Sequence, residues 1–275
     1  MGLRISTNIA SISAQRQLSK QQERSSHSME ALSSGSRIVH AADDAAGLAI
    51  SENLRGQIRG LGQAKQNASN AVSLVQTSEG GLNEISNILV RLRELGVQAA
   101  SDSIGDDERV YVDTESKQLL EEADRIAKTT RFGKRNLLDG SGDELEFQVG
   151  AFGNEDNVIK YKMKADATNS ALGINGISLD SKGGARDSLN TIDDAMNKLG
   201  QMRADFGAVQ SRLGMTASNL DIQSENLSAA NSRIRDADVA KETAEMASAN
   251  ILQQAATSVL AQANAQPNQA LRLIA

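Results

Sequence analysis

The chain has 275 residues and a net charge of −6, and it contains no cysteine, no tryptophan and a single proline. This weakly acidic balance provides no basic field for nucleic acid and no cationic face for anionic membranes. The missing cysteines exclude disulfides, thiolate nucleophiles and cysteine-based metal sites. Aromatic residues make up only 2% of the chain, and a chain poor in both aromatic side chains and helix breakers favours long helices packed side by side.

The N-terminal segment carries a thin apolar stripe at Ile5, Ile9 and Ile12. Its first residues lack the continuous apolar region of a secretory signal. The sequence also lacks any stretch of about 20 apolar residues, the length that crosses a bilayer as a helix. We therefore expect no membrane insertion, and export of the protein would need a route that does not use such a signal.

A long helix is predicted from about residue 54 to residue 99, because its apolar residues recur in steps of three and four. The stripe consists of Leu54, Ile58, Leu61, Ala68, Val72, Val75 and Leu82, followed by Ile85, Leu89, Leu92 and Ala99. After Leu82 it shifts by three residues, which is the pattern of a stammer. A further helix is predicted over residues 107–130, with an acidic first turn that complements the helix dipole.

In the middle of the chain the hydrophobic period changes from that of a helix to that of a strand. The alternating apolar residues are Leu145, Phe147 and Val149 in a first run, and Ile159, Tyr161 and Met163 in a second. Residues 150–157 connect the two runs, so a small β-hairpin is predicted near residues 145–163. The Gly-, Ser- and Asp-rich segments 139–143 and 180–187 are predicted to be loops.

The strongest periodic signal lies in the C-terminal half, where seven positions spaced seven residues apart are all apolar. They are Ile192, Leu199, Phe206, Leu213, Leu220, Leu227 and Ile234. At 1.5 Å per residue this predicts a coiled-coil-like helix about 63 Å long. The expected fold class is therefore mostly α: a long coiled-coil-like helical rod with a small β-hairpin region.

The C-terminal end differs from the rods. From Met246 to Leu271 the chain has no charged residue, and Ile251, Ala255 and Val259 lie on one stripe of mostly small side chains. Burying so few apolar atoms does not offset the roughly 1–2 kcal/mol per residue that ordering the backbone costs, so the terminal helices should fray when alone. Many copies packed together would order them, and an uncharged surface suits a crowded helical core. The sequence thus predicts self-assembly through its ends.

No cluster of residues points to catalysis, to a metal or to a cofactor. His27 and His40 have no metal-ligand spacing, and exposed or capping roles are expected for them. Asp43 and Asp44 are neighbours in sequence and would point to different sides of a helix, which favours a turn or a helix start over an acid–base pair. We therefore do not expect an enzyme, and no cofactor is expected.

Several short motifs resemble both ends of bacterial flagellins. They are residues 5–8, 32–38, 43–49, 91–98 and 136–139 in the N-terminal half, and 232–238, 251–255 and 258–264 in the C-terminal half. The resemblance implies a secreted, non-enzymatic structural protein that polymerises into the bacterial flagellar filament for motility. It also implies export through the flagellum-specific type III channel, which uses no cleaved signal.

The resemblance further implies how the chain is divided. Residues 1–43 and 235–275 would pair as an inner-core domain, and residues 44–234 would form an outer-core helical rod with the hairpin. The large variable surface domain of long flagellins is missing, because little chain remains between Met163 and Leu189. The residues implied for the self-assembly core are Ile5, Ile9, Ile12, Ile251, Ala255 and Val259.

The partners implied by the resemblance are copies of the chain itself, an export chaperone, the hook-junction and cap proteins, and vertebrate innate immune receptors. One receptor would contact Leu89, Arg91, Leu95, Gln98, Glu115 and Ile192, and a cytosolic receptor would read Leu271 and Leu273. On periodicity alone, the charged run 91–98 is a solvated helical face with pairs of opposite charge.

Two alternatives remain open. A hook–filament junction protein, related to flagellins, would share both terminal regions, although the density of matches in residues 32–49 and 251–264 favours flagellin itself. A soluble coiled-coil scaffold would share the long heptads, but it would have folded ends and would not self-assemble.

Overall fold

The computed structural model describes residues 7–142 and 144–274, with side chains as far as residue 266. The fold is mostly α, as predicted, with two small antiparallel sheets. In chain order the elements are α1 (Ile9–Ser34), α2 (Ala45–Ala99), α3 (Asp106–Thr129), β1 (Arg131–Phe132), β2 (Arg135–Asn136), β3 (Glu144–Gln148), η1 (Glu155–Asn157), β4 (Val158–Lys162), α4 (Asn169–Leu172), α5 (Lys182–Arg235) and α6 (Val239–Ile274).

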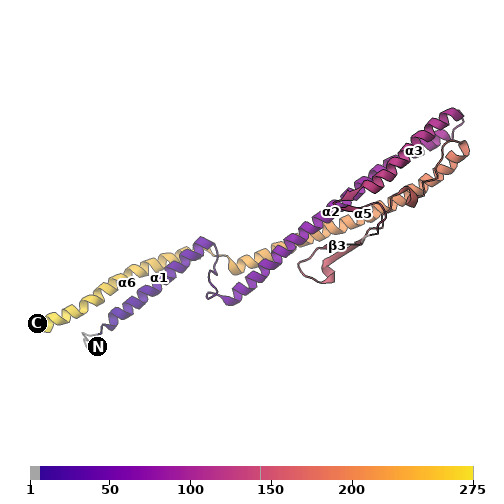
Figure 1. Ribbon diagram of the computed structural model, residues 1–275. Helices are drawn as coiled ribbons and strands as arrows, with labels where there is room; N and C mark the ends of the chain where they lie inside the picture. Colours follow the sequence, from indigo (N-terminus) through magenta and orange to yellow (C-terminus); the bar gives the residue numbers. More distant parts are fainter. Residues whose placement is uncertain (1–6, 143, 275) are drawn as a thin grey trace. The chain divides into compact units, whose positions relative to one another are not determined.

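The chain forms two compact units, and both α2 and α5 contribute to each of them. The terminal unit consists of Met1–Gly56 and Asn226–Ala275, and the central unit is Gln57–Glu225. In the terminal unit α1 and α6 lie side by side (Figure 1), and Asn8 and Ser11 at the start of α1 are hydrogen-bonded to Ala263 and Asn264 of α6. The long predicted rods are thus present, and each is a single unbroken helix of 54 or 55 residues.

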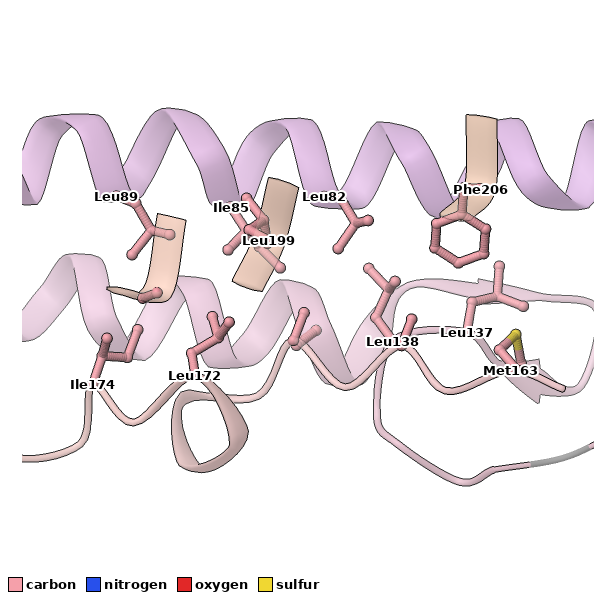
Figure 2. Close-up of a cluster of buried hydrophobic side chains, with 14 of the residues drawn as sticks. Leu82, Ile85, Leu89, Leu137, Leu138, Met163, Leu172, Ile174, Leu199 and Phe206 are labelled. Carbon is pink, nitrogen blue, oxygen red and sulfur yellow. The ribbon is translucent and has the colours of Figure 1, made fainter. Parts of the chain in front are cut away.

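The central unit closes over one continuous hydrophobic core. From α2, Leu82 and Ile85 are both fully buried, so the predicted three-residue shift in the stripe is confirmed. The heptad of α5 is buried at Ile192, Leu199, Phe206, Leu213 and Leu220. Figure 2 shows these helices and the irregular segments that carry Leu138 and Ile174 directing side chains into the same core. The spacing of apolar residues therefore gives the packing of the rod directly.

The predicted β-hairpin is confirmed as β3 and β4, which pair antiparallel with Leu145 opposite Tyr161 and Phe147 opposite Ile159. The ring of Tyr161 packs on α5, with its centroid 5.9 Å from that of Phe206. Burial in this contact, assisted by the charge of Asp205, raises the pKa of Tyr161 to about 12. The hairpin is therefore part of the hydrophobic core of the central unit.

The predicted loop at 180–187 is wrong over most of its length, because α5 already begins at Lys182. Ala185 and Ser188 are buried in the first turns of the helix. A Cβ atom on Gly184 would lie 2.9 Å from the carbonyl oxygen of Ser178. The glycine is thus required for close packing against the preceding segment, which is a tertiary reason that composition does not reveal.

Candidate functional site

The two terminal helices form an antiparallel pair whose seam is made of small and polar side chains. The buried members are Ala14, Ser25, Ser28 and Ala31 from α1, and Glu242, Ala249 and Ala263 from α6. The Asn8 amide donates to the Ala263 carbonyl oxygen at 2.8 Å, and the Ser25 hydroxyl donates to the Asn250 side-chain oxygen at 3.0 Å. These hydrogen bonds fix the register of a seam that buries little apolar surface.

The loop that follows α1 is tied to the turn between α5 and α6. Gly35 ends α1 in the left-handed conformation, with φ of 68°. Its carbonyl oxygen accepts a hydrogen bond from the Ala237 amide at 3.0 Å, and the Arg37 amide donates to the Arg235 carbonyl oxygen at 2.6 Å. The Arg37 guanidinium also donates to the Ile234 carbonyl oxygen at 2.7 Å. One end of the helix pair is therefore closed by backbone contacts.

The adjacent carboxylates at 43 and 44 have separate structural roles, as their positions in a turn predict. Asp43 accepts hydrogen bonds from the backbone amides of Val39 at 3.1 Å and His40 at 2.8 Å, and its other oxygen lies 3.2 Å from His27 Nε2. The His40 amide and the other donors lower the pKa of Asp43. Asp44 accepts from the Gly47 amide at 2.8 Å at the start of α2. Asp43 thus closes the turn, and Asp44 caps the start of α2.

The apolar residues expected in the self-assembly core lie on the outer faces of the helix pair. Ile9 is 63% exposed and Ile251 is 67% exposed, and Ile12 and Val259 are exposed as well. Ala255 is also exposed, between Ile251 and Val259 on α6. Ile5 lies outside the described residues, and so do the side chains of Leu271 and Leu273. The seam and this outer stripe therefore occupy different faces of α6.

Sequence reasoning identified the outer stripe of α6 and missed the seam. The seam residues of α6 recur every three or four positions: Glu242, Met246, Ala249, Gln253, Ala256, Leu260 and Ala263 are all at least partly buried. This spacing is a heptad, but only two members have large apolar side chains. A search for spacing alone, without regard to hydrophobicity, would have found it.

A second candidate surface is the charged run on α2, where Arg91 reaches across to α3. Its guanidinium donates two hydrogen bonds to one oxygen of Glu115, at 3.0 and 2.8 Å, and a third to Glu94 at 3.0 Å. Hydrogen bonding to Glu115 and then to Glu94 raises the pKa of Arg91. Gln98 is exposed on the same helix. The arrangement is a preoriented polar patch on the surface of the central unit.

Three of the residues expected to contact a receptor are not on this surface. Leu89, Leu95 and Ile192 are at most 1% exposed. They occupy the heptad core of α2 and α5, whereas Arg91, Gln98 and Glu115 are exposed. The family motif contains both packing and surface residues, and a resemblance in sequence alone does not separate them.

The remaining candidate residues are the two histidines of the chain. His27 and His40 are on the surface of the terminal unit and are paired with Asp43 and Glu30. Among the described side chains, no group of three His, Cys, Asp or Glu residues could hold a metal ion. Within the same part of the chain, no helix has an apolar stretch long enough to cross a bilayer.

Two family models match the chain. The model for the bacterial flagellin N-terminal helical region matches residues 5–143, and the model for the bacterial flagellin C-terminal helical region matches residues 189–274. Between them they include α1 to α3, almost all of α5, and α6.

Individual relatives are similar over nearly the whole chain. A flagellin of Halalkalibacterium halodurans is 42% identical over 273 residues, which are 98% of this chain and 99% of that protein. The flagellar filament core protein flaB2 of Brachyspira hyodysenteriae is 40% identical, over 98% of this chain and 99% of its own length. The crystal structure of a Bacillus cereus flagellin matches with a TM-score of 0.51 and 30% identity, over 60% of this chain and 94% of that one.

Proposed function

The chain belongs to the bacterial flagellin family and is an exported structural subunit of the flagellar filament, and we propose that the outer faces of its terminal helices hold the filament together. It is the short form of the family, because a flagellin of nearly equal length matches it from end to end. The polymer is the basis of motility. The further question is which residues make the contacts between copies.

The observation that carries the proposal is the exposure of Ile9, Ile12, Ile251 and Val259 on a helix pair that already has a seam of its own. Isolated apolar residues on a surface are common, but Ile251 and Val259 lie in the run from Met246 to Leu271 that has no charged residue, and an exposed apolar row of this kind marks an interaction site. Burial of apolar surface between copies supplies free energy at about 25 cal/mol per Å². Ile5 and Ala255 complete this proposed assembly surface.

The same reasoning divides the chain by role. We propose that residues 1–43 and 235–275 form the inner core of the filament and that residues 44–234 form the outer core. In support, the chain has two compact units whose limits lie near these positions, at Gly56 and Asn226. The terminal unit has the polar seam, and the central unit has the large hydrophobic core.

The proposed assembly surface is tested by replacing Ala255 with Glu. In the filament the carboxylate would be buried without a cation from the surrounding charge-free segment, which costs several kcal/mol per subunit even after relaxation. Seeded elongation, followed by light scattering and electron microscopy, should stop. The circular dichroism of the monomer should barely change, because Ala255 is exposed there.

Ala255→Ser is the matched control, since it keeps the side chain small and uncharged. We expect it to elongate nearly as the wild type does. Normal filaments from Ala255→Glu would show that this face of α6 is not buried in the polymer. Loss of helix in the monomer would show that the position acts in folding instead of assembly.

We propose that the remaining partners act on the same exposed faces. An export chaperone would cover the apolar stripe of α6 before polymerisation, and the hook-junction and cap proteins would adjoin the first and last copies of the filament. Export would use the flagellum-specific type III channel. The family is one of structural proteins, and we propose that the chain has no catalytic activity.

Recognition by vertebrate innate immune receptors is proposed at the polar patch of α2 and α3. Arg91, Gln98 and Glu115 are exposed there, and arginine is frequent among the residues that dominate binding energy. A cytosolic receptor would read the last residues of the chain, including Leu271 and Leu273.

A further inference from the structure

A filament of identical copies needs two different surfaces on each copy that fit each other, because a head-to-tail contact joins unlike faces. The terminal helices supply apolar contacts, but apolar burial is non-directional and does not by itself fix the register between neighbours. Charged groups arranged with opposite sign do fix register and orientation. The central unit has two exposed surfaces of opposite charge that its own folding does not explain.

The first is a basic turn, formed by β1 and β2 directly after the end of α3. Arg131, Lys134 and Arg135 are all exposed on it. Among the described residues none of the three makes an ion pair. Phe132 stands between them with 40% of its surface exposed. In a chain with a net charge of −6, three cations without an ion pair in the described residues thus lie within five positions of the sequence.

A shallow hollow of about 600 Å³ lies beside this turn. Phe132, Lys134 and Arg135 of the turn line it, together with the apolar residues Leu74, Leu145 and Phe147. Glu144 and Glu146 line it as well, and Glu146 lies 3.4 Å from Lys160. The hollow therefore has an apolar lining and a cationic rim formed by Lys134 and Arg135 of the β1–β2 turn, while β3 contributes the carboxylates of Glu144 and Glu146.

The second surface is an acidic tip at the other end of α3. Asp102, Asp106, Asp107 and Glu108 are exposed in and after the turn that joins α2 to α3. Asp102 is paired with Lys182, and Asp106 with Arg109. Asp107 makes no ion pair within the described chain. Two large side chains follow on the same helix.

Those side chains are Val110 and Tyr111, and Tyr111 is 75% exposed. An exposed aromatic ring can fill an apolar hollow, and an unpaired carboxylate next to the ring can pair with cations at the rim of that hollow. α3 has 24 residues, so at 1.5 Å per residue the two surfaces are about 36 Å apart along it. One copy cannot bring them together, and two copies can.

We propose that the acidic tip of one copy docks on the basic turn of the next copy in the filament. Tyr111 enters the hollow beside Phe132, and Asp107 pairs with Lys134 or Arg135. The cationic rim also favours the face of the tyrosine ring, since a cation over an aromatic face is attracted to it. This contact deepens the polymerisation stated above and rests on it. It sets the register of neighbours, and the terminal helices supply the apolar burial.

The test is a charge exchange measured by seeded elongation at low ionic strength. Lys134→Glu places a carboxylate opposite Asp107 of the next copy, and Asp107→Lys places an ammonium opposite the basic turn. Like charges in an interface are strongly unfavourable, and we expect each single variant to raise the critical concentration about tenfold, which corresponds to 1.4 kcal/mol. The double variant restores opposite charges and should return to within about twofold of the wild type.

Lys164→Glu is the matched control. It makes the same charge change at an exposed position of the central unit outside both surfaces, and it should elongate as the wild type does. Salt gives a second readout: raising the ionic strength from 0.01 M to 0.15 M shortens the screening length from about 30 to 8 Å, so the difference between single variants and wild type should shrink.

Circular dichroism of each monomer verifies that the variants fold. Single variants that elongate normally at low salt would overturn the contact and leave the assembly surface of the terminal helices intact. A double variant whose loss is the product of the two single losses would also overturn it, because independent sites add. Wild-type protein that fails to extend a seed would overturn the polymerisation from which the contact is inferred.

Discussion

Arg91 and Arg93 are two residues apart on α2 and are tied to different helices. Arg91 pairs with Glu115 of α3, whereas Arg93 Nε donates to Asp193 of α5 at 2.8 Å. All four side chains are about half exposed, and pairs of this kind contribute little to stability. The ion pair of Arg91 therefore serves mainly to orient the guanidinium, because one carboxylate oxygen accepts hydrogen bonds from two of its nitrogens.

We expect Arg91→Ala to weaken receptor activation by the monomer without impairing filament assembly, because a planar guanidinium with several donors is a typical binding anchor. Arg93→Ala is the matched control, removing the same charge and a similar interhelical pair. A reporter-cell assay with each monomer, alongside seeded elongation, checks both. Equal signalling by the two variants would show that the receptor contact was assigned to the wrong residue.

The lowered pKa of Asp43 predicts how the stability of the terminal unit depends on pH. A carboxyl group whose pKa is depressed on folding stabilises the fold above its ordinary value of 3.8, and this stability is lost as the pH falls through the depressed value. Asp43→Asn should therefore lower the melting temperature of the terminal unit at pH 7. The difference in melting temperature between the variant and the wild type should become smaller near pH 3, and thermal unfolding followed by circular dichroism measures it. A gap of equal size at both pH values contradicts the assignment.

The hairpin of β3 and β4 depends on α5 for its place in the central unit. Tyr161 meets Phe206, which is fully buried in the heptad of that helix. Phe206→Ala would leave a cavity beneath the hairpin, and large-to-small changes of this type cost about 3–5 kcal/mol. Denaturant unfolding of the monomer should show this decrease in the free energy of unfolding.

Phe152→Ala provides the comparison, since Phe152 is exposed in the loop between the same two strands. A surface change of this sort is expected to stay within about 0.5 kcal/mol. If both variants lose equal stability, the hairpin is not anchored through Phe206.

The elements differ in how far sequence predicts them. The heptads at 192–220 and the shift after Leu82 were correct because large apolar side chains mark every buried position. The seam of α6 was missed because Ala249 and Ala263 are buried by register and hydrogen bonding. Leu89 lies on the predicted apolar stripe and is buried, as is Leu95, and the resemblance that names both as receptor contacts gives their presence in a motif and not their direction. The start of α5 was misplaced because Gly183 and Gly184 resemble a loop in composition.

The two compact units also differ in how they are stabilised. The central unit has a continuous core of large side chains, including Leu82, Leu138 and Phe206, whereas the seam of the terminal unit is built mainly from small and polar side chains. Elements with few buried apolar contacts open most readily. Their stability in the assembled state then depends on neighbouring copies.

Limited proteolysis of the monomer should therefore remove the terminal helices before it cuts the central unit, leaving a fragment close to residues 57–225. Mass spectrometry of the products identifies the first cuts. The same digestion of filaments should spare the ends, since copies cover them. Early cleavage within α2 or α5 between residues 57 and 225 would contradict this ranking.

The antiparallel course of α1 and α6 has a mechanical consequence. Because α1 starts beside the C-terminal third of α6, where Asn8 is bonded to Ala263, a force that separates the two helices from this side acts on one pair of residues at a time. The contacts of the helix pair then break one after another at low force. A force along the helix axes would instead load all the contacts at the same time. The backbone bonds of Gly35 and Arg37 lie at the closed end. Tension at the open end therefore reaches them last, and released helices can close again from an intact hinge.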